Sequence, residues 1–358
     1  MAVGNRRRRS AVAVVTVGAI FAFGAGLYGL NASGSWPFPS RYCWGAWEED
    51  SGPSFLGEEA LAKSGSERRS EESPPPSPVR ANATCTLAVA SSVADADSTH
   101  PLTFDERVVL EYRPVPAGAE ERRAWMAHFF DGSASPLPDG LNGLVADDRA
   151  MLVLPDSCDA DGRPSVVTIR SESWGDGHLG KKAMPFSIGS RMDVARMLVA
   201  AAEATMTKAG CTPGKPLRLT SPLAVTAEKD EPAAGTLCRI PGLTFEFGKG
   251  SAYQQQVGAV GQRLQTCSVV WRARGVPDEP AAQFVMAAEP RIVALFDGLP
   301  EGVGEGLVRA TCDGRPTVFY GNVEPGLKVL RRPDDRQMFV KFVESVSKRI
   351  GCKVGEAT

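Results

Sequence analysis

"SCDADGRPSVVTIR" at residues 157–170 and "TCDGRPTVFYG" at residues 311–321 are two versions of one stretch, about 150 residues apart. Each holds a cysteine, an Asp-Gly pair and a run of apolar residues rich in β-branched side chains. Asp and Gly accept the positive φ that tight hairpin turns require, so each stretch predicts a turn between two antiparallel strands. Their recurrence predicts that one structural unit occurs twice in the chain.

The repetition extends on both sides of these stretches. Downstream, residues 193–214 align without a gap to residues 334–355, with Asp, Met, Val, Glu, Gly, Cys and Gly at equal spacing. Matches that keep one order, with the eight cysteines divided four and four, favour internal duplication over two unrelated domains. Upstream, three more pairs of segments match: Thr84–Ala90 with Thr266–Ala273, Val108–Pro114 with Phe284–Pro290, and Phe129–Gly132 with Leu295–Gly298.

Each copy is predicted to fold as three strands, a helix, two strands and a second helix. Short β-branched runs bounded by Gly, Pro and Asp are typical of strands, whereas the aligned downstream segments place apolar residues at helical intervals. Gly210 and Gly351 end these two helices, because glycine readily takes the left-handed cap conformation. We therefore expect an α+β fold: one N-terminal transmembrane helix, then two tandem homologous domains, each an antiparallel sheet with packed helices.

Composition sets the expected domain boundaries. The first copy spans 40–211 and the second spans 236–358, with a linker at 212–235 whose apolar run at 222–225 is a candidate extra strand. The first copy is longer because of an insertion at about 61–83, "LAKSGSERRSEESPPPSPVRANA". This insertion is too polar and too rich in proline to bury itself, so it predicts a disordered surface loop.

The amino terminus predicts a membrane anchor. Arg6–Arg9 precede residues 11–30, which carry no charge and are long enough as a helix to cross a hydrocarbon core of about 30 Å. The arginines place residues 1–10 in the cytoplasm and the rest of the chain outside the cell, as a single-pass protein of the cell membrane. The alternative is a cleaved secretory peptide, for which residues 31–35, "NASGS", offer a site; both readings export the body of the protein.

The eight cysteines predict structural disulfides, because an even number of cysteines at repeated positions outside the membrane is usually paired. Spacing alone allows three pairings within each copy. A final helix of roughly 17 residues, about 25 Å long, would return Cys352 to the level of Cys312, and the same path brings Cys211 to Cys158. Elimination then gives the expected set: Cys43–Cys85, Cys158–Cys211, Cys238–Cys267 and Cys312–Cys352.

Nucleotide and nucleic-acid binding are not expected. Residues 175–182, "GDGHLGKK", satisfy G-x-G-x-x-G, but the next helix begins about ten residues later, whereas a phosphate cradle needs a helix that starts at once. We interpret this segment as a mobile glycine loop. The net charge is −2 and no long basic run follows Arg6–Arg9, so the chain lacks the electrostatic footprint of a nucleic-acid-binding protein.

The sequence also predicts no catalytic, metal or cofactor-binding residue. His100, His128 and His178 share no helical spacing, and His128 is expected to pack beside Trp125 and Phe129. Neither H-E-x-x-H nor G-x-S-x-G occurs, so zinc-protease and serine-hydrolase signatures are missing. The cysteines contain no C-x-x-C, which disfavours metal and redox sites. "SCDADG" resembles a calcium loop but lacks its glutamate, and is interpreted as a turn.

Two segments carry a family resemblance. They are "CWGA" (Cys43–Ala46) and "GLVADDRAMLVLPDSC" (Gly143–Cys158), together with the arginine-rich start and the single anchor. In these features the chain resembles a group of uncharacterised actinobacterial membrane-anchored exported proteins with a duplicated four-cysteine α+β unit. The resemblance covers most of the chain and implies no activity or catalytic residue.

Two functional hypotheses follow. The first is a binding or scaffolding module for an extracytoplasmic protein or a cell-wall polymer, with the ligand in the groove between the two copies. Trp44 and Trp47 could contact that ligand, although packing against the Cys43 disulfide competes with this role. The alternative is a cell-envelope hydrolase whose carboxylates, about 5–10 Å apart, come together only in three dimensions. We expect the binding module rather than the enzyme, because no catalytic pattern is present.

Overall fold

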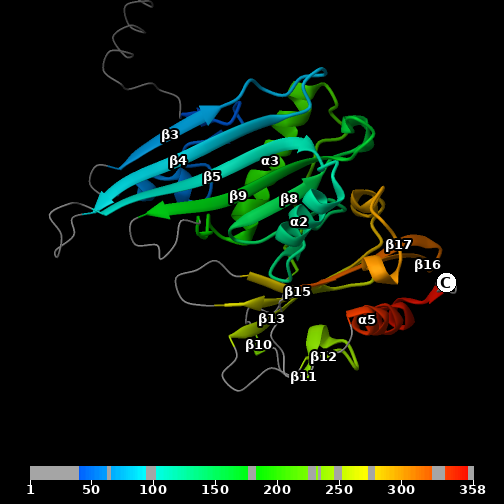
Figure 1. Cartoon of the computed structure of the whole chain (residues 1–358). Coiled ribbons are helices and arrows are strands. Elements are labelled where there is room, and N and C mark those ends of the chain that lie inside the picture. Colours follow the sequence, from blue (N-terminus) through cyan, green and yellow to red (C-terminus); the bar gives the residue numbers. More distant parts are fainter. Residues whose placement is uncertain are drawn as a thin grey trace, which may run out of the picture. The chain divides into compact units, whose positions relative to one another are not determined.

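The computed structural model describes residues 40–62, 66–93, 102–175, 183–224, 231–232, 235–245, 252–272, 279–324 and 335–353 (Figure 1). The predicted cytoplasmic tail and transmembrane helix, residues 1–10 and 11–30, lie outside these ranges. Among the residues in these ranges, no helix is both long and apolar enough to cross a membrane. Arg41–Thr358 is one unit by its internal contacts, and it contains two seven-stranded antiparallel sheets.

The first sheet has the strand order β3-β4-β5-β9-β8-β7-β6. Helix α2 (Ala119–Phe129) connects β5 to β6, and helix α3 (Arg191–Ala209) follows β9. The strands are β3 (Glu67–Glu72), β4 (Ala83–Val93), β5 (Leu102–Pro114), β6 (Ser135–Pro136), β7 (Gly143–Val145), β8 (Arg149–Val153) and β9 (Ser165–Gly175).

The second sheet has the order β10-β13-β14-β15-β17-β16-β18. Helix α4 (Pro290–Val293) runs into a 3-10 turn, Ala294–Phe296, and helix α5 (Asp335–Ile350) follows β17. The strands are β10 (Glu231–Pro232), β13 (Tyr253–Val260), β14 (Leu264–Trp271), β15 (Glu279–Ala287), β16 (Leu307–Cys312), β17 (Arg315–Val323) and β18 (Cys352–Lys353).

Short elements precede each large sheet. β1 (Arg41–Tyr42) pairs with β2 (Trp47–Glu48), and β11 (Gly235–Thr236) pairs with β12 (Thr244–Phe245). The remaining 3-10 turns are η1 (Ser54–Leu56), η2 (Glu58–Leu61), η3 (Asp156–Cys158), η4 (Leu237–Arg239) and η6 (Val303–Glu305).

The two sheets share a strand order. β4-β5-β9-β8 of the first sheet corresponds to β14-β15-β17-β16 of the second, with a helix after β5 or β15 and a longer helix after β9 or β17. The predicted turns are confirmed. The backbone angle φ is 53° at Asp161 and 50° at Asp313, and the glycine that follows each of them also has a positive φ. The α+β class, with antiparallel sheets and few helices, is therefore confirmed.

Helix α3 illustrates why these segments are helical. Ser190 caps its first turn by accepting a hydrogen bond from the backbone N–H of Asp193, and the alanine-rich sequence that follows favours helix. Gly210 ends the helix in the left-handed conformation, at the residue that the sequence predicts. The buried side chains Val194 and Leu198 pack against one face of the first sheet (Figure 1), and α5 covers one face of the second sheet in the same way.

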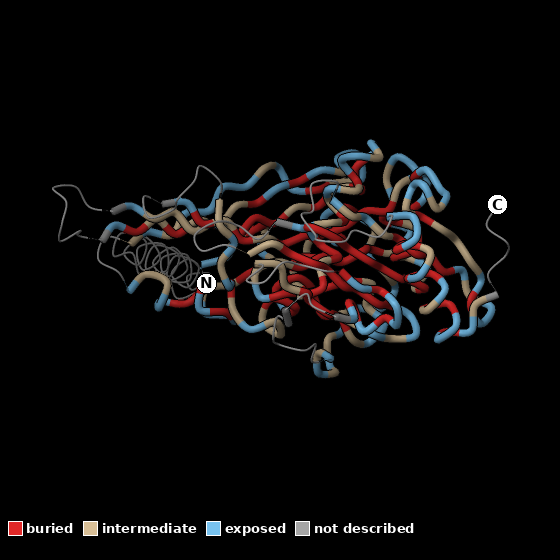
Figure 2. Tube along the Cα trace, turned by 60° about the horizontal axis from the view of Figure 1, so that its bottom comes forward, coloured by how far each residue is buried: buried red, intermediate tan, exposed pale blue. Residues whose placement is uncertain are grey.

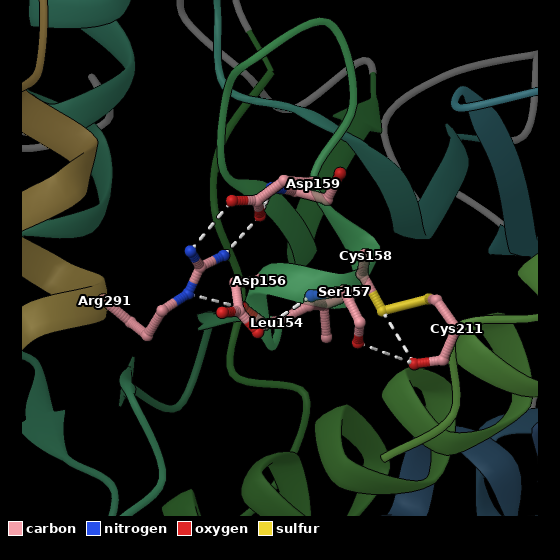
Figure 3. Close-up of polar contacts among 8 residues, drawn as sticks. Leu154, Asp156, Ser157, Cys158, Asp159, Cys211 and Arg291 are labelled. Carbon is pink, nitrogen blue, oxygen red and sulfur yellow. Dashed lines mark hydrogen bonds and ion pairs between the residues drawn. A yellow bond between two sulfur atoms is a disulfide. The ribbon is translucent and has the colours of Figure 1, made fainter.

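The four disulfides pair the cysteines as the sequence predicts, and they are Cys43–Cys85, Cys158–Cys211, Cys238–Cys267 and Cys312–Cys352. Cys158–Cys211 joins the turn before β9 to the end of α3 (Figure 3). The chain-entropy model gives each bridge at most about 4 kcal/mol of stabilisation, because it closes a loop of some tens of residues in the unfolded chain.

The predicted disordered loop at 61–83 is wrong for part of its length. Glu67–Glu72 form β3, whose six residues all pair with β4 at the edge of the first sheet. An edge strand pairs with only one neighbouring strand, and the side chains of β3 are mostly exposed to solvent. Charged side chains on such a strand disfavour pairing of the open edge with another chain. Arg68 alone turns inward: its side chain is 3% exposed and pairs with Glu49 at 2.9 Å.

The expected linker packs on the first half of the chain. Leu217, Leu219 and Leu223 lie against the core of the first sheet, and the carboxylate of Asp139 accepts hydrogen bonds from the backbone N–H groups of Thr220 and Ser221 at 2.6 and 2.9 Å. The candidate strand at 222–225 does not form among its described residues, 222–224. Proline and the side-chain bonds to Asp139 hold this segment as an irregular strap.

The faces of the two sheets that point away from α3 and α5 pack on each other through one apolar core. Met126 and Phe130 from the α2 region contact this core from the first half, and Phe296 and Tyr320 do so from the second. The ring centroids of Phe130 and Phe296 are 6.0 Å apart, and those of Phe296 and Tyr320 are 5.7 Å apart. Buried residues accordingly run through the middle of the chain in Figure 2. Much of the expected groove between the copies is thus filled.

A polar clamp fastens the edge of this shared core. The Nε of Arg291, in α4, donates to the carbonyl oxygen of Leu154 at 2.8 Å, and its other two nitrogens bind both carboxylate oxygens of Asp159 (Figure 3). Arg122, in α2, adds a second polar contact by donating to the carbonyl oxygens of Pro116 and Asp297. Bidentate arginine contacts fix orientation as well as distance, so they hold the two sheets in one register.

The two halves of the chain approach each other closely at Gly132. Its N–H donates to the hydroxyl of Ser268 at 2.9 Å, and a Cβ atom here would lie only 1.8 Å from the carbonyl oxygen of Gln256. No side chain fits this position without separating the sheets.

We expect G132A to lower the free energy of unfolding by about 3 kcal/mol or more, because overpacking against backbone forces the shared core apart. Urea unfolding followed by circular dichroism measures the effect. G118A is the control, since Gly118 has a negative φ and open space, and should cost less than about 1 kcal/mol. Equal unfolding midpoints for the two variants would contradict the contact.

Candidate functional site

A cleft of about 760 Å³ opens where the shared apolar core ends. The first half of the chain contributes the end of α2, the start of β8 and the middle of β9, and the second half contributes β13 and the start of β15. The described lining consists of Ala127, His128, Asp131, Ser133, Asp147, Asp148, Arg149, Arg170, Ser171, Glu172, Ala183, Met184, Pro185, Gln256, Arg272 and Pro280.

Arg149 is the centre of the charged cluster in this cleft. Its side chain is 12% exposed and binds Asp148 at 2.6 Å, Asp131 at 2.7 Å and the hydroxyl of Ser133 at 2.9 Å, while its Nε has no partner in the described structure. Burial opposes the charge of Arg149, but attraction to the carboxylates Asp131 and Asp148 outweighs it and raises the pKa of the guanidinium. The arginine therefore stays protonated and holds both carboxylates in place.

The same surroundings disfavour the charged form of Asp148, whereas they favour the charged form of Arg149. Burial raises its pKa above the ordinary value, and the negative charges of Asp131 and Asp147 add to this shift, while Arg149 counteracts it. A carboxyl group with a raised pKa in a cleft is a candidate proton donor, although structural ion-pair networks perturb pKa values too.

A second ion pair continues the cluster along β9. Arg170 binds Glu111 at 3.2 Å and Glu172 at 2.9 Å, and it lies directly opposite Arg149 on the neighbouring strand. Residues opposite each other on adjacent strands point to the same side of a sheet. Arg149, Arg170 and Glu172 therefore share the face that turns toward the second sheet.

His128, at the end of α2, is neutral in this cleft. The ring packs edge-on against Phe129 with centroids 4.8 Å apart, as the sequence predicts for a packed histidine. Part of the His128 residue remains accessible to solvent, but the protein atoms packed around it disfavour the charged ring. This desolvation, with the positive charge of Arg149, lowers the pKa to about 4, against a smaller opposite effect of Asp131. It can both donate and accept a hydrogen bond at neutral pH.

Gln256 lines the cleft and belongs to a polar row across the second sheet. Gln256 lies opposite Ser268, and Ser268 lies opposite Gln283 on the next strand. The amide of Gln283 donates to the carbonyl oxygen of Ala127 at 3.2 Å. Gln256 is only 8% exposed, and its Oε1 has no hydrogen-bond partner among the described residues. Leaving such an acceptor unpaired costs about 1–3 kcal/mol, so this position suits a ligand that donates.

A second cleft, of about 640 Å³, lies between β6 and β13. Its lining is mostly aliphatic side chains and glycine backbone, and its charged residues include Arg263 and Glu289, which pair with each other at 3.1 Å. It offers less polar chemistry than the Arg149 cleft, which we take as the candidate site.

The predicted ligand contact at the two tryptophans is not supported. Trp47 is 2% exposed and its indole N–H donates to the carbonyl oxygen of Met197 at 3.0 Å, so it belongs to the core under α3, and a ligand contact there is wrong. The indole N–H of Trp44 donates to the carbonyl oxygen of Ser73 at 2.9 Å, and the ring packs on the same core. The Cys43–Cys85 disulfide draws this segment inward, in line with the competing interpretation.

The other motifs have structural roles where they are described. Asp159 accepts the bidentate contact from Arg291, and Asp161 takes part in a turn and pairs with Arg163 at 3.3 Å. Gly175 ends β9, whereas residues 176–182 of the glycine loop, with His178, lie outside the described residues, as does His100.

Sequence reasoning missed the Arg149 cluster. Asp148 stands in a common surface pattern, and Asp131 is 18 residues from Arg149, so neither position suggests a site by itself. The available signal was the charged pair Arg170 and Glu172, which follows the apolar residues Val166 and Val167 in the same predicted strand. Because alternate residues share a face, the pair indicates a face of the strand that becomes charged part of the way along it.

We expect R149M to lower the free energy of unfolding by about 3–5 kcal/mol at neutral pH, because it leaves Asp131 and Asp148 buried without their counter-ion. The loss should shrink at acid pH, where Asp148, whose pKa is raised by burial, can be protonated. R196M is the matched control: Arg196 is exposed and pairs only with Asp193 one helical turn away, so its loss should stay below about 1 kcal/mol. A pH-independent loss in R149M would argue against buried carboxylates.

We expect the His128 ring to titrate near pH 4 instead of 6.5 in an NMR titration. Between these values the unfolded chain binds a proton that the folded protein does not, so stability falls as the pH is lowered from about 6.5 to about 4. H128Q should remove that part of the pH dependence of urea unfolding. A ring that titrates near 6.5 would mean that Arg149, Asp131 and Arg170 do not surround it as described.

The chain matches no family model, no curated protein and no solved structure. Its candidate site is therefore assessed from its own chemistry: a cleft between two sheets, with a buried guanidinium that holds two carboxylates, a neutral histidine and an unpaired amide oxygen.

Proposed function

We propose that this protein is an exported binding module, anchored in the cell membrane through residues 11–30 with its amino terminus in the cytoplasm, whose cleft binds an extracytoplasmic protein or a cell-envelope polymer. The observation that carries the proposal is the cleft itself, which both sheets line and in which Arg149, Asp131 and Asp148 are already fixed. Concave sites with a few convergent polar groups are typical of ligand binding. The four disulfides favour an exported protein.

We further infer that residues 40–211 and 236–358 are copies of one ancestral unit. The shared strand order, the matched helices and two disulfides in each half support this inference. Where the two copies pack on each other, side chains from both copies line the boundary between them, and these side chains differ between the copies. The cleft at that boundary can then take a ligand that neither half would bind alone.

A cell-envelope hydrolase is the second candidate, and the raised pKa of Asp148 favours it. A general acid and a nucleophile or base must both be free to reach a substrate. Here Asp131 and Asp148 bind two nitrogens of the same guanidinium, which occupies both carboxylates. Their arrangement suits recognition better than proton transfer.

In-cell crosslinking tests the binding module. A photoreactive amino acid at Ser133, on the cleft, should capture a reproducible partner in intact cells, whereas the same group at the exposed Asp313, on the β16–β17 turn, should not. Capture at both positions would indicate non-specific proximity and contradict the proposal. Hydrolysis of a cell-wall polymer by the purified protein, abolished in D148N, would establish the hydrolase in its place.

A further inference from the structure

We propose that the cleft and the adjoining open face of the first sheet bind a basic polypeptide segment through lysine or arginine side chains. This inference rests on the proposed binding function and names the chemistry of the partner. The open face consists of Glu67, Arg69, Glu71, Asp105, Arg107 and Trp174, on β3, β5 and β9. It begins where the second sheet no longer covers the first.

The strand register makes the open face continuous with the cleft. Arg107 on β5 lies directly opposite Glu172 of the cleft, and Asp105 lies opposite Trp174. Residues two apart along β9 point to the same side, so Arg170, Glu172 and Trp174 form one row. The contact of Val166 with the shared core shows that this is the side facing the second sheet.

Carboxylates outnumber guanidinium groups in both parts of this surface. The ratio is three to two on the open face, and four to three among the described residues that line the cleft. His128 adds no positive charge, since it is neutral above about pH 4. The electrostatic influence of Glu71 and Asp105 reaches both Arg69 and Arg107, so the open-face charges form one network. The surface as a whole therefore attracts cations.

Apart from the Nε of Arg149, the charged or buried polar groups of this surface that lack partners accept hydrogen bonds. Arg69 binds Glu67 at 2.7 Å, Arg107 binds Asp105, and Arg149 and Arg170 are engaged within the cleft. By contrast, the side chains of Glu71 and Asp147 make no hydrogen bond or ion pair with any residue that the structure describes. The buried Oε1 of Gln256, which lines the cleft, is likewise unpaired. A matching ligand brings N–H donors and positive charge.

Trp174 adds an aromatic surface for a cation. It is among the few large apolar residues exposed in the described structure, at 40%. It lies opposite Asp105 on β5 and two residues from Glu172 on its own strand. The face of an indole ring attracts ammonium and guanidinium groups more strongly than other aromatic side chains do. A carboxylate beside it reinforces that attraction.

The geometry also sets a spacing. Four residues separate Trp174 from Arg170 at the cleft, which is about 13 Å along an extended strand. In an extended peptide, side chains four residues apart point the same way and span about the same distance. Two basic residues at positions i and i+4 can therefore occupy the cleft and the Trp174 site together. A neutral glycan would leave the surplus of carboxylates unmatched.

Isothermal titration of the full-length protein in neutral detergent tests the proposal. The probe is a Gly/Ser peptide with two arginines four residues apart, and it should bind with an affinity that falls as salt is raised. D147N and W174L should each weaken binding about tenfold, the loss expected for one charge-assisted contact. D313N is the matched control, because it removes the same charge from an exposed Asp outside this surface, and it should change affinity less than twofold.

The other probes separate this inference from the proposed function. A neutral oligosaccharide and an amine-bearing oligosaccharide are titrated alongside, with thermal melting of each variant to confirm folding. Salt-independent binding of the neutral sugar, or equal losses of affinity in D147N and D313N, would contradict the inference of a basic peptide ligand. The proposal that the protein is a binding module would remain. Tighter binding of the amine-bearing sugar than of the peptide would indicate that the site binds a cationic glycan, and it would likewise contradict the inference of a peptide ligand. Failure of all three probes, with crosslinking capture at Ser133, rejects only the cation chemistry.

Discussion

Met151 and Val153 from β8 share one buried apolar core with Val285, Val318 and Tyr320 from the second sheet, and the rest of the structure depends on this core. Each sheet has a face covered by its own long helix, and each would expose a second apolar face if it stood alone. Burial of apolar surface contributes about 25 cal/mol per Å², so these two faces strongly favour each other over water. The two halves are consequently parts of one unit, although each half has its own sheet with the same order of its four central strands.

The cleft exists because the two sheets differ in extent. β5 and β9 are longer than the strands that cover them, so β9 is apolar at Val166, under the second sheet, and charged from Arg170 onward. At that border Arg149 is too buried to be solvated fully and too close to water to be replaced by an apolar side chain. Binding two carboxylates satisfies it, and the same arrangement gives the cleft its polar wall.

The parts of this structure that depend on neighbouring residues were predictable from the sequence. The Asp-Gly turns, the glycine caps of α3 and α5 and the duplicated cysteines are local signals, and the disulfide pairing follows from the path that they define. β3 was mistaken for a disordered loop because its composition is polar, and only its pairing with β4 makes it a strand. The cleft was not predictable, since it requires the register of β8 on β9 and the approach of Gly132 to another sheet.

The clamp between Arg291 and Asp159 (Figure 3), with the shared apolar core beside it, opposes movement of one sheet relative to the other. A cleft whose walls are held in this way does not close around a ligand, so its shape must already fit that ligand. Little conformational entropy is then lost on association, and encounter, rather than a slow opening of the molecule, limits how fast a complex forms. A preformed cleft selects its ligand by excluding molecules whose shape or charge does not fit, because its side chains do not rearrange to accommodate them.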